Sequence, residues 1–384
     1  MGVAQLTRNA VDVLPEGELE RKLAKGRPLR AKLGIDVTSP DIHLGRGIPL
    51  QRLRAFQDEG HKAVLIIGDY TTRIGDPSGR SSERPILSDE EIDANAQRYL
   101  EQAKAILLDD PDLLEVRHNG EWLSKLTFAD VVRLTRTLTV ARLLERDDFS
   151  KRFGSGEPIS VSELLYPLMQ AYDSVAIEAD VELGGTDQLY NLLAGREVMS
   201  AYGLEPQVVL TTPLLLSWDG EKMSSSIGNN IPLTAPPEEM FGRTMRIPDS
   251  MLEDWWRLVV EQPVPAGDPM DTKLALARFI VTRSHGEEAA RQAEEHFTRV
   301  VREGQAPEET PEAELPQDGP VLHLPKLLVD FLGVGSTSEA RRMISQGGVK
   351  IDGEVVSELD LPRERLEGAL IQAGKRRYMR FRAA

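Results

Sequence analysis

The chain has 384 residues, enough for two or three domains, and its 40% hydrophobic and 28% charged residues are ordinary for a soluble globular protein. It contains no cysteine, which excludes disulfides, thiolate zinc clusters and cysteine nucleophiles. A net charge of −16 argues against a general nucleic-acid coat.

The N-terminal third predicts a parallel β-α-β unit. Residues 1–28 have no long apolar run, so we expect neither a secretory signal nor a membrane span, and a cytoplasmic location. Residues 29–36 are a weak strand candidate, 44–60 have apolar residues near helical spacing, and 63–71 (AVLIIGDYT) are an apolar, largely β-branched strand. Ligands of such parallel sheets bind where the strands end.

The middle of the chain alternates helical and apolar patterns. Residues 89–107 and 128–146 are predicted to be helices, and 207–217 a core strand interrupted by Pro213. Residues 236–303 have a mostly helical pattern of mixed charge. Residues 304–320 contain four prolines, five acidic residues and no basic one, a composition that predicts an extended linker.

The last segment, 321–384, is more basic than the rest. It holds 11 Lys and Arg against 8 Asp and Glu, while the remainder holds 35 against 54. Two short amphipathic helices are expected on either side of GVGSTS, followed by two strands around a D-G turn. Arg341, Arg342 and Lys350 could share one face. We expect RNA binding, although charge alone also fits a solvated surface.

Five polar segments are candidates for chemistry. They are DIHLGRG (41–47), GDYTTRIGDPSGRSSER (68–84), YPLMQAYDSVA (166–176), ELGGTDQ (182–188) and DGEKMSSSIGNN (219–230). In the third, Tyr166, Gln170 and Asp173 stand at i, i+4 and i+7, on one helix face. Taken singly, each segment also fits an ordinary turn, polar network or solvated loop.

Together these segments resemble a class I aminoacyl-tRNA synthetase, with HLGRG at the HIGH position and KMSSS at the KMSKS position. More narrowly, GIDVTSPDIHLGRG, LIIGDYTTRIGDPSGRSSER, YPLMQAYDSVAIEADVELGGTDQLYNLLAGR and EKMSSSIGN resemble the bacterial tyrosyl-tRNA synthetase family, in order and over nearly the whole chain.

The resemblance implies an α/β fold with several parts. They are a Rossmann-like parallel-sheet catalytic domain (1–220) with a dimer-forming insertion at about 110–160, a KMSKS-type loop and helical anticodon-arm domain (221–303), a linker (304–320) and a small α+β RNA-binding module (321–384).

The resemblance also implies an ATP site. Activation joins a carboxylate to the α-phosphate of ATP and expels pyrophosphate, so positioning and cations do most of the work. The catalytic candidates are His43, Arg46, Arg80, Arg84, Lys222 and Ser225. The ATP-binding candidates are Thr38, His43, Gly45, Gly185, Asp187, Lys222, Met223, Ser224, Ser225 and Ser226.

The tyrosine-binding candidates are Asp36, Asp76, Tyr166, Gln170, Asp173 and Gln188. By resemblance, Asp76, Tyr166 and Gln170 hold the ammonium group, Gln188 lies near the carboxylate, and Asp173 accepts the phenol. A buried acceptor separates tyrosine from phenylalanine, because phenylalanine leaves it unpaired.

Three positions depart from the family pattern. Arg46 replaces the second histidine of HIGH, and a guanidinium has no acceptor capacity. Ser225 replaces the second lysine of KMSKS. Lys32 stands where one branch of the family has a tyrosine that contacts the phenol, which leaves more of that recognition to Asp173.

We therefore expect a homodimeric tyrosine–tRNA ligase that uses ATP with Mg²⁺ as a substrate complex, tyrosine and tRNA(Tyr). We expect no tightly bound metal, no organic cofactor and no membrane partner. Three alternatives stay open: an adenylate-forming paralogue with a small-amine acceptor, a non-enzymatic RNA-binding or splicing protein, and a tryptophan enzyme. Asp173 disfavours the last, because indole has a single donor and a larger volume.

Overall fold

The computed structural model describes residues 2–76, 87–225, 227–302, 311–317, 319–374 and 377–382. They divide into two compact units, one of Met1–Ala235 with Arg246–Leu276 and one of Pro236–Met245 with Ala277–Ala384. No helix in these ranges is both long and apolar enough to cross a membrane.

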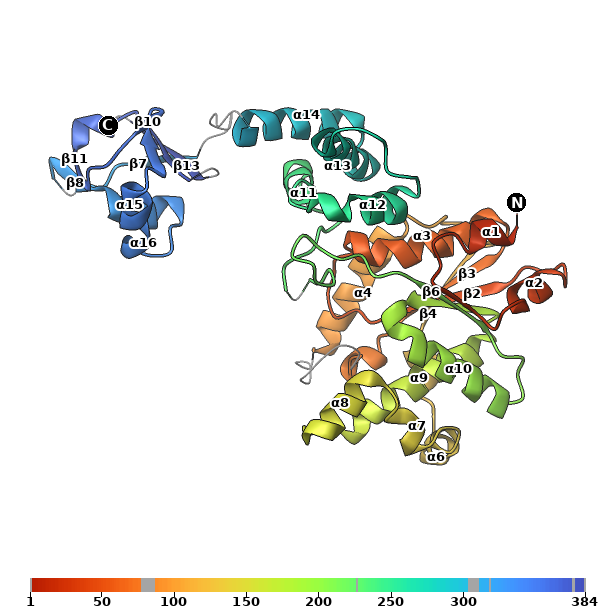
Figure 1. Cartoon of the computed structure of the whole chain (residues 1–384). Coiled ribbons are helices and arrows are strands. Elements are labelled where there is room, and N and C mark those ends of the chain that lie inside the picture. The colour runs from red at the N-terminus through yellow and green to blue at the C-terminus, as the bar shows by residue number, and fades with distance from the viewer. Residues whose placement is uncertain are drawn as a thin grey trace. The chain divides into compact units, whose positions relative to one another are not determined.

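The first unit is built on a six-stranded sheet of order β1-β6-β5-β2-β3-β4 (Figure 1). Its strands are β1 (Asp12–Leu14), β2 (Arg30–Ile35), β3 (Lys62–Ile67), β4 (Leu114–His118), β5 (Val181–Gly185) and β6 (Val208–Thr212). All neighbours pair in parallel except β1, which runs antiparallel to β6 along one edge. The expected Rossmann-like α/β fold is confirmed.

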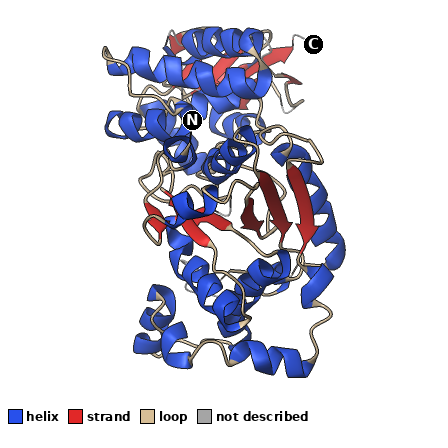
Figure 2. Cartoon of the chain, turned by 90° about the vertical axis from the view of Figure 1, so that its right-hand side faces the viewer, coloured by secondary structure: helices blue, strands red, loops and turns tan. Residues whose placement is uncertain are grey.

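Helices cover both faces of this sheet, as Figure 2 shows from the side. Its helices are α1 (Val3–Leu6), α2 (Glu18–Leu23), α3 (Leu44–Asp58), α4 (Asp89–Ala103), α5 (Gly120–Leu123), α6 (Phe128–Thr135), α7 (Val140–Leu143), α8 (Asp147–Ser155), α9 (Val161–Ile177), α10 (Leu189–Ala201) and α12 (Leu252–Trp255). The unit also contains three 3₁₀ helices, η1 (Thr71–Arg73), η2 (Thr186–Gln188) and η3 (Asp249–Met251), and a π-helix, η4 (Trp256–Val260).

The alternation of β3 shows why the two layers form. Leu65 packs in the cluster that contains the apolar residues of α3 and α4, whereas Ile66 packs with Ile177 at the end of α9. A strand between two apolar layers reads as a continuous apolar run, which is why residues 63–67 were recognisable from sequence. Strand β6 ends at Thr212 because Pro213 has no N–H to donate.

The single helix expected over 128–146 is wrong, because two shorter helices, α6 and α7, occupy this region instead. Thr127 and Thr139 each cap a new helix by accepting a hydrogen bond from a backbone N–H three residues on. Between them Thr135 and Thr137 bond to carbonyls of the preceding turn. β-Branched hydroxyl residues have low helix propensity and favour caps, so the pattern breaks here.

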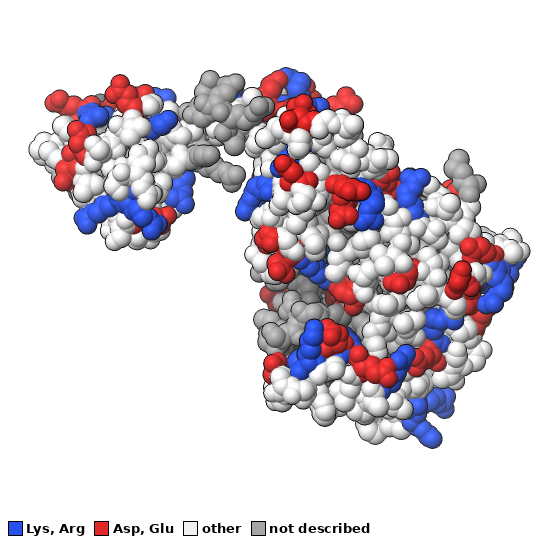
Figure 3. All heavy atoms as spheres, viewed as in Figure 1, with Lys and Arg blue, Asp and Glu red and all other residues white. Residues whose placement is uncertain are grey.

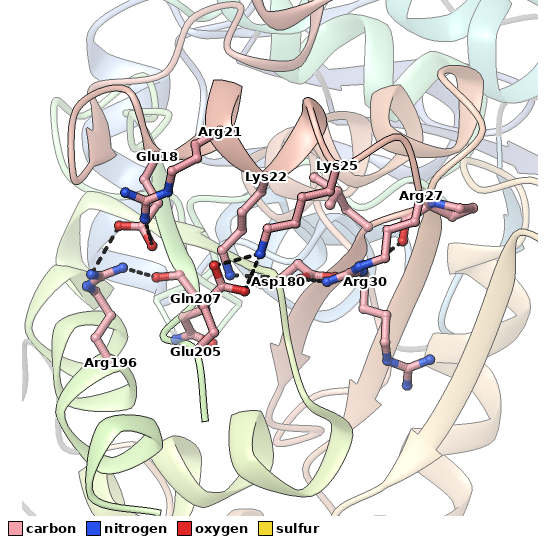
Figure 4. Close-up of polar contacts among 12 residues, drawn as sticks. Glu18, Arg21, Lys22, Lys25, Arg27, Arg30, Asp180, Arg196, Glu205 and Gln207 are labelled. Carbon is pink, nitrogen blue, oxygen red and sulfur yellow. Dashed lines mark hydrogen bonds and ion pairs between the residues drawn. The ribbon is translucent and has the colours of Figure 1, made fainter. Parts of the chain in front are cut away.

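A charged cluster lies at the amino ends of the strands, opposite the edge where ligands of such sheets bind (Figure 4). Asp180, directly before β5, accepts both terminal nitrogens of Arg27 at 2.7 and 2.6 Å and the N–H of Arg30 at 2.9 Å. The Lys22 Nζ of α2 lies 3.8 Å from the same carboxylate. This cluster fastens α2 to β2 and β5.

The second unit contains α11 (Pro237–Thr244), the end of α13 (Pro269–His285), α14 (Glu287–Phe297) and η5 (Thr298–Arg302). Phe241 of α11 and Phe297 of α14 have ring centroids 5.5 Å apart. The expected helical pattern over 236–303 agrees with these elements.

The C-terminal part of this unit has its own core and a five-stranded sheet of order β10-β9-β12-β13-β7, with a separate β11-β8 pair. Its elements are β7 (Glu312–Glu314), β8 (Val321–His323), α15 (Leu324–Leu332), α16 (Thr337–Ser345), β9 (Val349–Ile351), β10 (Glu354–Val355), β11 (Asp360–Pro362), η6 (Arg363–Arg365), β12 (Leu370–Ala373) and β13 (Arg377–Arg382).

The linker expected over 304–320 is shorter at its C-terminal end. Residues 312–314 pair in parallel with β13, and Leu315 is buried in the core of the module. An edge strand needs only backbone hydrogen bonds and one apolar anchor, so an acidic, proline-rich composition does not exclude it. Residues 303–310 lie outside the described ranges.

Candidate active site

The candidate site lies where parallel strands end. Asp36 follows β2, η1 follows β3 after Gly68, η2 follows β5, and the loop containing Lys222 follows β6. Because the carboxyl ends of parallel strands share one edge, segments separated by up to about 190 residues meet there.

His43 is the N-cap of α3. Its Nδ1 accepts the N–H of Arg46 at 3.3 Å, which places the imidazole proton on Nε2. Burial lowers the pKa of His43 to about 3, with the charges of Arg46 and Lys222 acting in the same direction. The ring is therefore neutral at pH 7 and offers a hydrogen-bond donor at the start of a helix, where anions are favoured.

Arg46 and Tyr99 hold polar atoms that are buried without a hydrogen-bond partner among the described residues. They are Nη1 of Arg46 and the hydroxyl of Tyr99. Burial raises the pKa of Tyr99, and the charge of Arg46 opposes this, which shows that the two groups are neighbours. An unsatisfied buried guanidinium N–H next to His43 is suited to a phosphate oxygen.

Asn229 organises the loop that contains Lys222. Its side-chain amide donates to Asp219 at 2.9 Å and to the carbonyl of Lys222 at 3.2 Å, while its oxygen accepts the N–H of Ser224 at 2.8 Å. The hydroxyl of Ser225 accepts from Asn230 at 3.2 Å. Lys222 itself is more than half exposed and forms an ion pair with Asp187.

Two glycines leave room for this loop and its partners. A Cβ on Gly45 would lie 3.2 Å from the imidazole of His43 and 3.5 Å from the Cβ of buried Met223. A Cβ on Gly185 would lie 2.6 Å from Oδ1 of Asp187. Larger residues at either position would displace a predicted ATP contact.

The predicted ATP contacts form one half of the site, and the predicted tyrosine contacts form the other. Asp36 is the centre of this second half. The hydroxyl of Thr71 donates to Oδ1 at 2.8 Å, and the hydroxyl of Tyr166 donates to Oδ2 at 2.9 Å. The N–H of Asp76 donates to Oδ2 at 3.2 Å. Burial raises the pKa of Tyr166, helped by the charges of Asp36 and Asp76, so its phenol remains a donor.

Asp76 connects this half to η2 and to the inserted helices. Its Oδ2 accepts Nε2 of Gln188 at 2.7 Å, and its Oδ1 lies 3.3 Å from Nη2 of Arg146. Arg146, directly before α8, was not identified from the sequence. It is buried, pairs with Asp148 at 2.7 Å and contacts Asn191 at 3.2 Å.

Asp173 lies on the same face of α9 as Tyr166 and is buried. It accepts Nε1 of Trp122 at 2.8 Å and Nδ2 of Asn119 at 3.3 Å. Burial raises the pKa of Asp173 to about 7, because these neutral donors and the charge of Lys32 offset only part of the desolvation. Asn119 and Trp122 follow β4, a strand that the sequence did not predict.

Gln170 and Lys32 meet a carboxylate that was also not predicted. Nε2 of Gln170 donates to Oε1 of Glu182 at 3.2 Å, and Nζ of Lys32 lies 2.8 Å from the same oxygen. Lys32 makes no hydrogen bond to Asp173 among the described contacts. It lies below α9 and bonds to this helix instead.

The two halves meet at η2, where Asp187 contacts Lys222 and the adjacent Gln188 contacts Asp76. His43, Asp76, Asp173 and Lys222 are thus linked through neighbouring groups of one unit. Thr38 lies in the loop between β2 and His43, and no hydrogen bond of its side chain is described. Arg80, Arg84 and Ser226 lie outside the described residues.

The candidate RNA-binding residues belong to the second unit. Arg341 and Arg342 are exposed on α16, and Lys350 is partly exposed on β9. In Figures 1 and 3, basic side chains gather on the side of the C-terminal module where α16 lies. In the described ranges, no group of three or more His, Asp or Glu side chains is arranged to hold a metal ion.

Comparison with known proteins agrees with this geometry. The family model described as tRNA synthetases class I (W and Y) matches residues 24–302, and the S4 domain matches residues 324–360. The chain is therefore built as a class I tRNA synthetase with an S4 domain.

Relatives that match over nearly their full length show to which branch of this family the chain belongs. The tyrosine–tRNA ligase of Thermotoga maritima is 48% identical, covering 98% of this chain and 96% of the relative, and that of Haemophilus influenzae is 45% identical, covering 99% and 96%. The solved tyrosyl-tRNA synthetase of Archaeoglobus fulgidus, complexed with L-tyrosine, is 26% identical with a TM-score of 0.61 and covers 76% of this chain and 98% of that one. The chain belongs to the tyrosyl-tRNA synthetase family.

Proposed function

We propose that the chain is a tyrosine–tRNA ligase, which forms tyrosyl-adenylate and pyrophosphate from tyrosine and ATP and then transfers tyrosine to the terminal ribose of tRNA(Tyr). The observation that carries the proposal is the junction at η2. There the half of the site with the imidazole of His43 and the cation of Lys222 adjoins the half with partly buried Asp76 and buried Asp173.

The ATP half stabilises charge without an enzyme nucleophile. The tyrosine carboxylate attacks the α-phosphorus, and the bond to the β-phosphate oxygen breaks. His43 donates from neutral Nε2, and the buried Nη1 of Arg46 supplies a cationic donor. Lys222 leaves Asp187 to meet the departing pyrophosphate, and Asp187 then becomes available to a ribose hydroxyl. Mg²⁺ arrives with ATP as part of the substrate and shields its phosphate oxygens.

The tyrosine half of the site has hydrogen-bond acceptors for the ammonium group and for the phenol of the substrate. Asp76, Tyr166 and Gln170 provide acceptors for the ammonium group, and Asp173 provides a buried acceptor for the phenol. Asn119 and Trp122 hold Asp173 in place. Phenylalanine and tryptophan do not offer the phenol donor, so they leave the remaining acceptor capacity of this buried carboxylate unused.

The S4 domain and the helical segments provide the RNA contacts. The helices in residues 236–303 meet the anticodon arm, and Arg341, Arg342 and Lys350 neutralise phosphates of the tRNA. Deleting residues 321–384 should leave tyrosine-dependent ATP–pyrophosphate exchange intact and reduce tRNA charging. Equal charging by the truncated chain would remove this module from tRNA recognition.

The inserted helices provide a homodimer surface. Five large apolar side chains are exposed on α6, α7, α8 and the first turn of α9: Phe128, Val132, Val140, Phe153 and Val161. Such exposed apolar patches mark interaction sites. Phe128→Asp should lower the molar mass measured by sedimentation equilibrium from dimer to monomer, whereas Val355→Asp, at an exposed apolar residue of the S4 domain, should not.

One pair of assays tests the proposed function. ATP–pyrophosphate exchange with each of the twenty amino acids should respond to tyrosine, and total bacterial tRNA should then accept labelled tyrosine. Exchange without charging would support a paralogue with another acceptor, and no exchange would support an RNA-binding protein. Because tyrosine, ATP and tRNA all occur in the cytoplasm, we propose that location.

A further inference from the structure

A buried ion pair lies beneath the tyrosine half of the site. Lys32 of β2 and Glu182 of β5 are at most 1% exposed, and Nζ lies 2.8 Å from Oε1. Desolvating two charges costs a large free energy, and well-packed apolar residues often replace such pairs without loss of stability. Stability alone therefore does not explain this ion pair, and its other contacts point to a role in the site.

Lys32 holds the backbone of α9 from below. Besides Glu182, its Nζ donates to the carbonyl of Gln170 at 2.9 Å and to the hydroxyl of Ser174 at 2.8 Å. An ammonium group has three N–H donors, so all three are used. The turn of α9 that presents Gln170 is fixed to the sheet by these bonds.

Glu182 holds the side chain of the same residue. Its Oε1 accepts Nε2 of Gln170 at 3.2 Å, and its Oε2 accepts from Ser174 at 3.2 Å and from the side chain of Gln207. A Cβ on Gly195 of α10 would lie 3.2 Å from Oε2 of Glu182 and closer still to the amide of Gln207. The carboxylate therefore has little room to move.

This arrangement determines which way the Gln170 amide faces. A carboxylate in an ion pair accepts hydrogen bonds and donates none, so the NH₂ group of Gln170 must be the part that faces Glu182. The amide oxygen is then left for a donor on another side. A substrate ammonium group is such a donor, whereas an amide in the reversed orientation would present N–H groups to it.

We propose that the Lys32–Glu182 pair is a positioning device for the substrate ammonium group, which acts by holding Gln170 with its carbonyl oxygen toward that group. The inference rests on the proposed function, because it takes tyrosine as the substrate and Gln170 as a contact of its ammonium group. Lys32 and Glu182 touch Gln170 and not the reacting atoms.

The proposal predicts different effects on the binding of ligands with and without an ammonium group. Tyrosine carries an ammonium group, whereas 3-(4-hydroxyphenyl)propanoate has the same phenol and carboxylate but no ammonium group. Loss of the Gln170 orientation should weaken binding of tyrosine and leave binding of the analogue unchanged. A general loosening of the pocket would weaken both.

The test uses isothermal titration calorimetry with both ligands on full-length protein. Lys32→Met/Glu182→Met removes both charges and the acceptor, and should weaken tyrosine binding roughly 10-fold or more, because a hydrogen bond to a charged group is lost. Lys32→Met/Glu182→Gln keeps an acceptor for Gln170 and should bind tyrosine within about 3-fold of the wild type. Both variants should bind the analogue like the wild type.

The charge-reversed variant Lys32→Glu/Glu182→Lys provides a second test if the apolar variant does not fold. It keeps an ion pair but places a donor where Glu182 stood, so tyrosine binding should again fall and analogue binding should not. Arg152→Met/Glu163→Met is the control, because it removes another buried ion pair that includes the first turn of α9. It should change neither affinity.

Equal losses for tyrosine and the analogue, or no loss of tyrosine binding in the apolar and charge-reversed variants, would overturn the proposal. Its failure is distinguishable from failure of the proposed function. The proposed function fails if the wild type lacks tyrosine-dependent ATP–pyrophosphate exchange, and the positioning role fails if the wild type is active and the ligand selectivity does not change.

Discussion

A buried aspartate lies at each end of the six-stranded sheet, and the pKa values of the two carboxyl groups are shifted in opposite directions. At the amino end, burial opposes ionisation of Asp180, but hydrogen bonds from Arg27 and from the N–H of Arg30, together with the charge of Arg27, outweigh it and lower its pKa. At the carboxyl end, burial dominates and raises the pKa of Asp173 to about 7, because its direct donors are neutral.

The difference shows how a structural carboxylate differs from a binding carboxylate. Asp180 has its counter-ions in the protein and joins α2 to the sheet (Figure 4). Among the described residues, Asp173 accepts hydrogen bonds from Asn119 and Trp122 and forms no salt bridge, which leaves hydrogen-bonding capacity for the ligand that we propose. Under the proposed function, the carboxylate at one end of the sheet stabilises the fold and the carboxylate at the other end recognises the substrate.

We expect the largest effect from removing the carboxylate at the amino end of the sheet, and we expect it on the stability of the fold. Asp180→Ala should lower the free energy of unfolding by about 3–5 kcal/mol, because it leaves Lys22 buried without its main counter-ion. Urea denaturation would measure the loss. The Michaelis constant for tyrosine should stay near the wild-type value at temperatures where the variant is folded; a large change would mean that the two ends are coupled.

The matching substitution at the other end should act on recognition. Asp173→Ala should cost about 1–3 kcal/mol of tyrosine binding, because the phenol loses its buried acceptor, and should reduce discrimination against phenylalanine. Exchange kinetics with the two amino acids would measure both. Unchanged discrimination would refute the role of Asp173 as the phenol acceptor.

Two lysine–aspartate pairs extend the comparison. Lys22–Asp180 is buried, whereas Lys222 is more than half exposed in its ion pair with Asp187. Lys222→Met should slow adenylate formation about 10- to 100-fold, as expected when one cationic group is removed from the transition state. Tyrosine affinity should change little, and unfolding should change by less than about 0.5 kcal/mol because the pair is exposed. A large loss of tyrosine affinity would assign Lys222 to the other half of the site.

The stability should also depend on pH with opposite sign at the two ends. The pKa of Asp173 is raised on folding, so its contribution to stability is present below its unfolded pKa of 3.8 and is lost as pH rises to about 7. The pKa of Asp180 is lowered, so its contribution is present above 3.8 and is lost as pH falls through its folded value.

The same titration should appear in activity. The kcat/KM for tyrosine should fall by at most about tenfold per pH unit as pH is lowered through about 7, since protonated Asp173 is a poorer acceptor. Asp173→Asn should flatten this limb of the profile, measured by exchange between pH 5.5 and 8.5. A profile that keeps the same limb would assign the titration to another group.

Much of the fold followed from local patterns. The run at 63–67 predicted β3, and the segment GVGSTS with the D-G turn predicted the order of α16, β9 and β10. Asp352 and Gly353 have φ values of 49° and 89°, which suit this dipeptide in a tight turn. The helix face of Tyr166, Gln170 and Asp173 was also predicted, because its spacing depends only on the period of a helix.

The site residues that were not predicted from the sequence were missed for the same reason. Asn119, Trp122, Arg146 and Glu182 act through partners from 12 to 70 residues away in sequence. The segment NGEWL after β4 could have been found if that strand had been recognised, but the strand's run of Leu, Glu, Val, Arg and His has only weak alternation. Pairing with β3 makes it a strand.

By itself, the sequence determined many of the elements and the chemical groups available, because propensity, capping and periodicity act over a few residues. It indicated a nucleotide site at His43 and a phenol acceptor at Asp173 by resemblance. Only the tertiary structure decided which charges are neutralised within the protein and which stay available to substrates. That outcome depends on burial and on partners brought together from distant segments, and no local pattern contains either quantity.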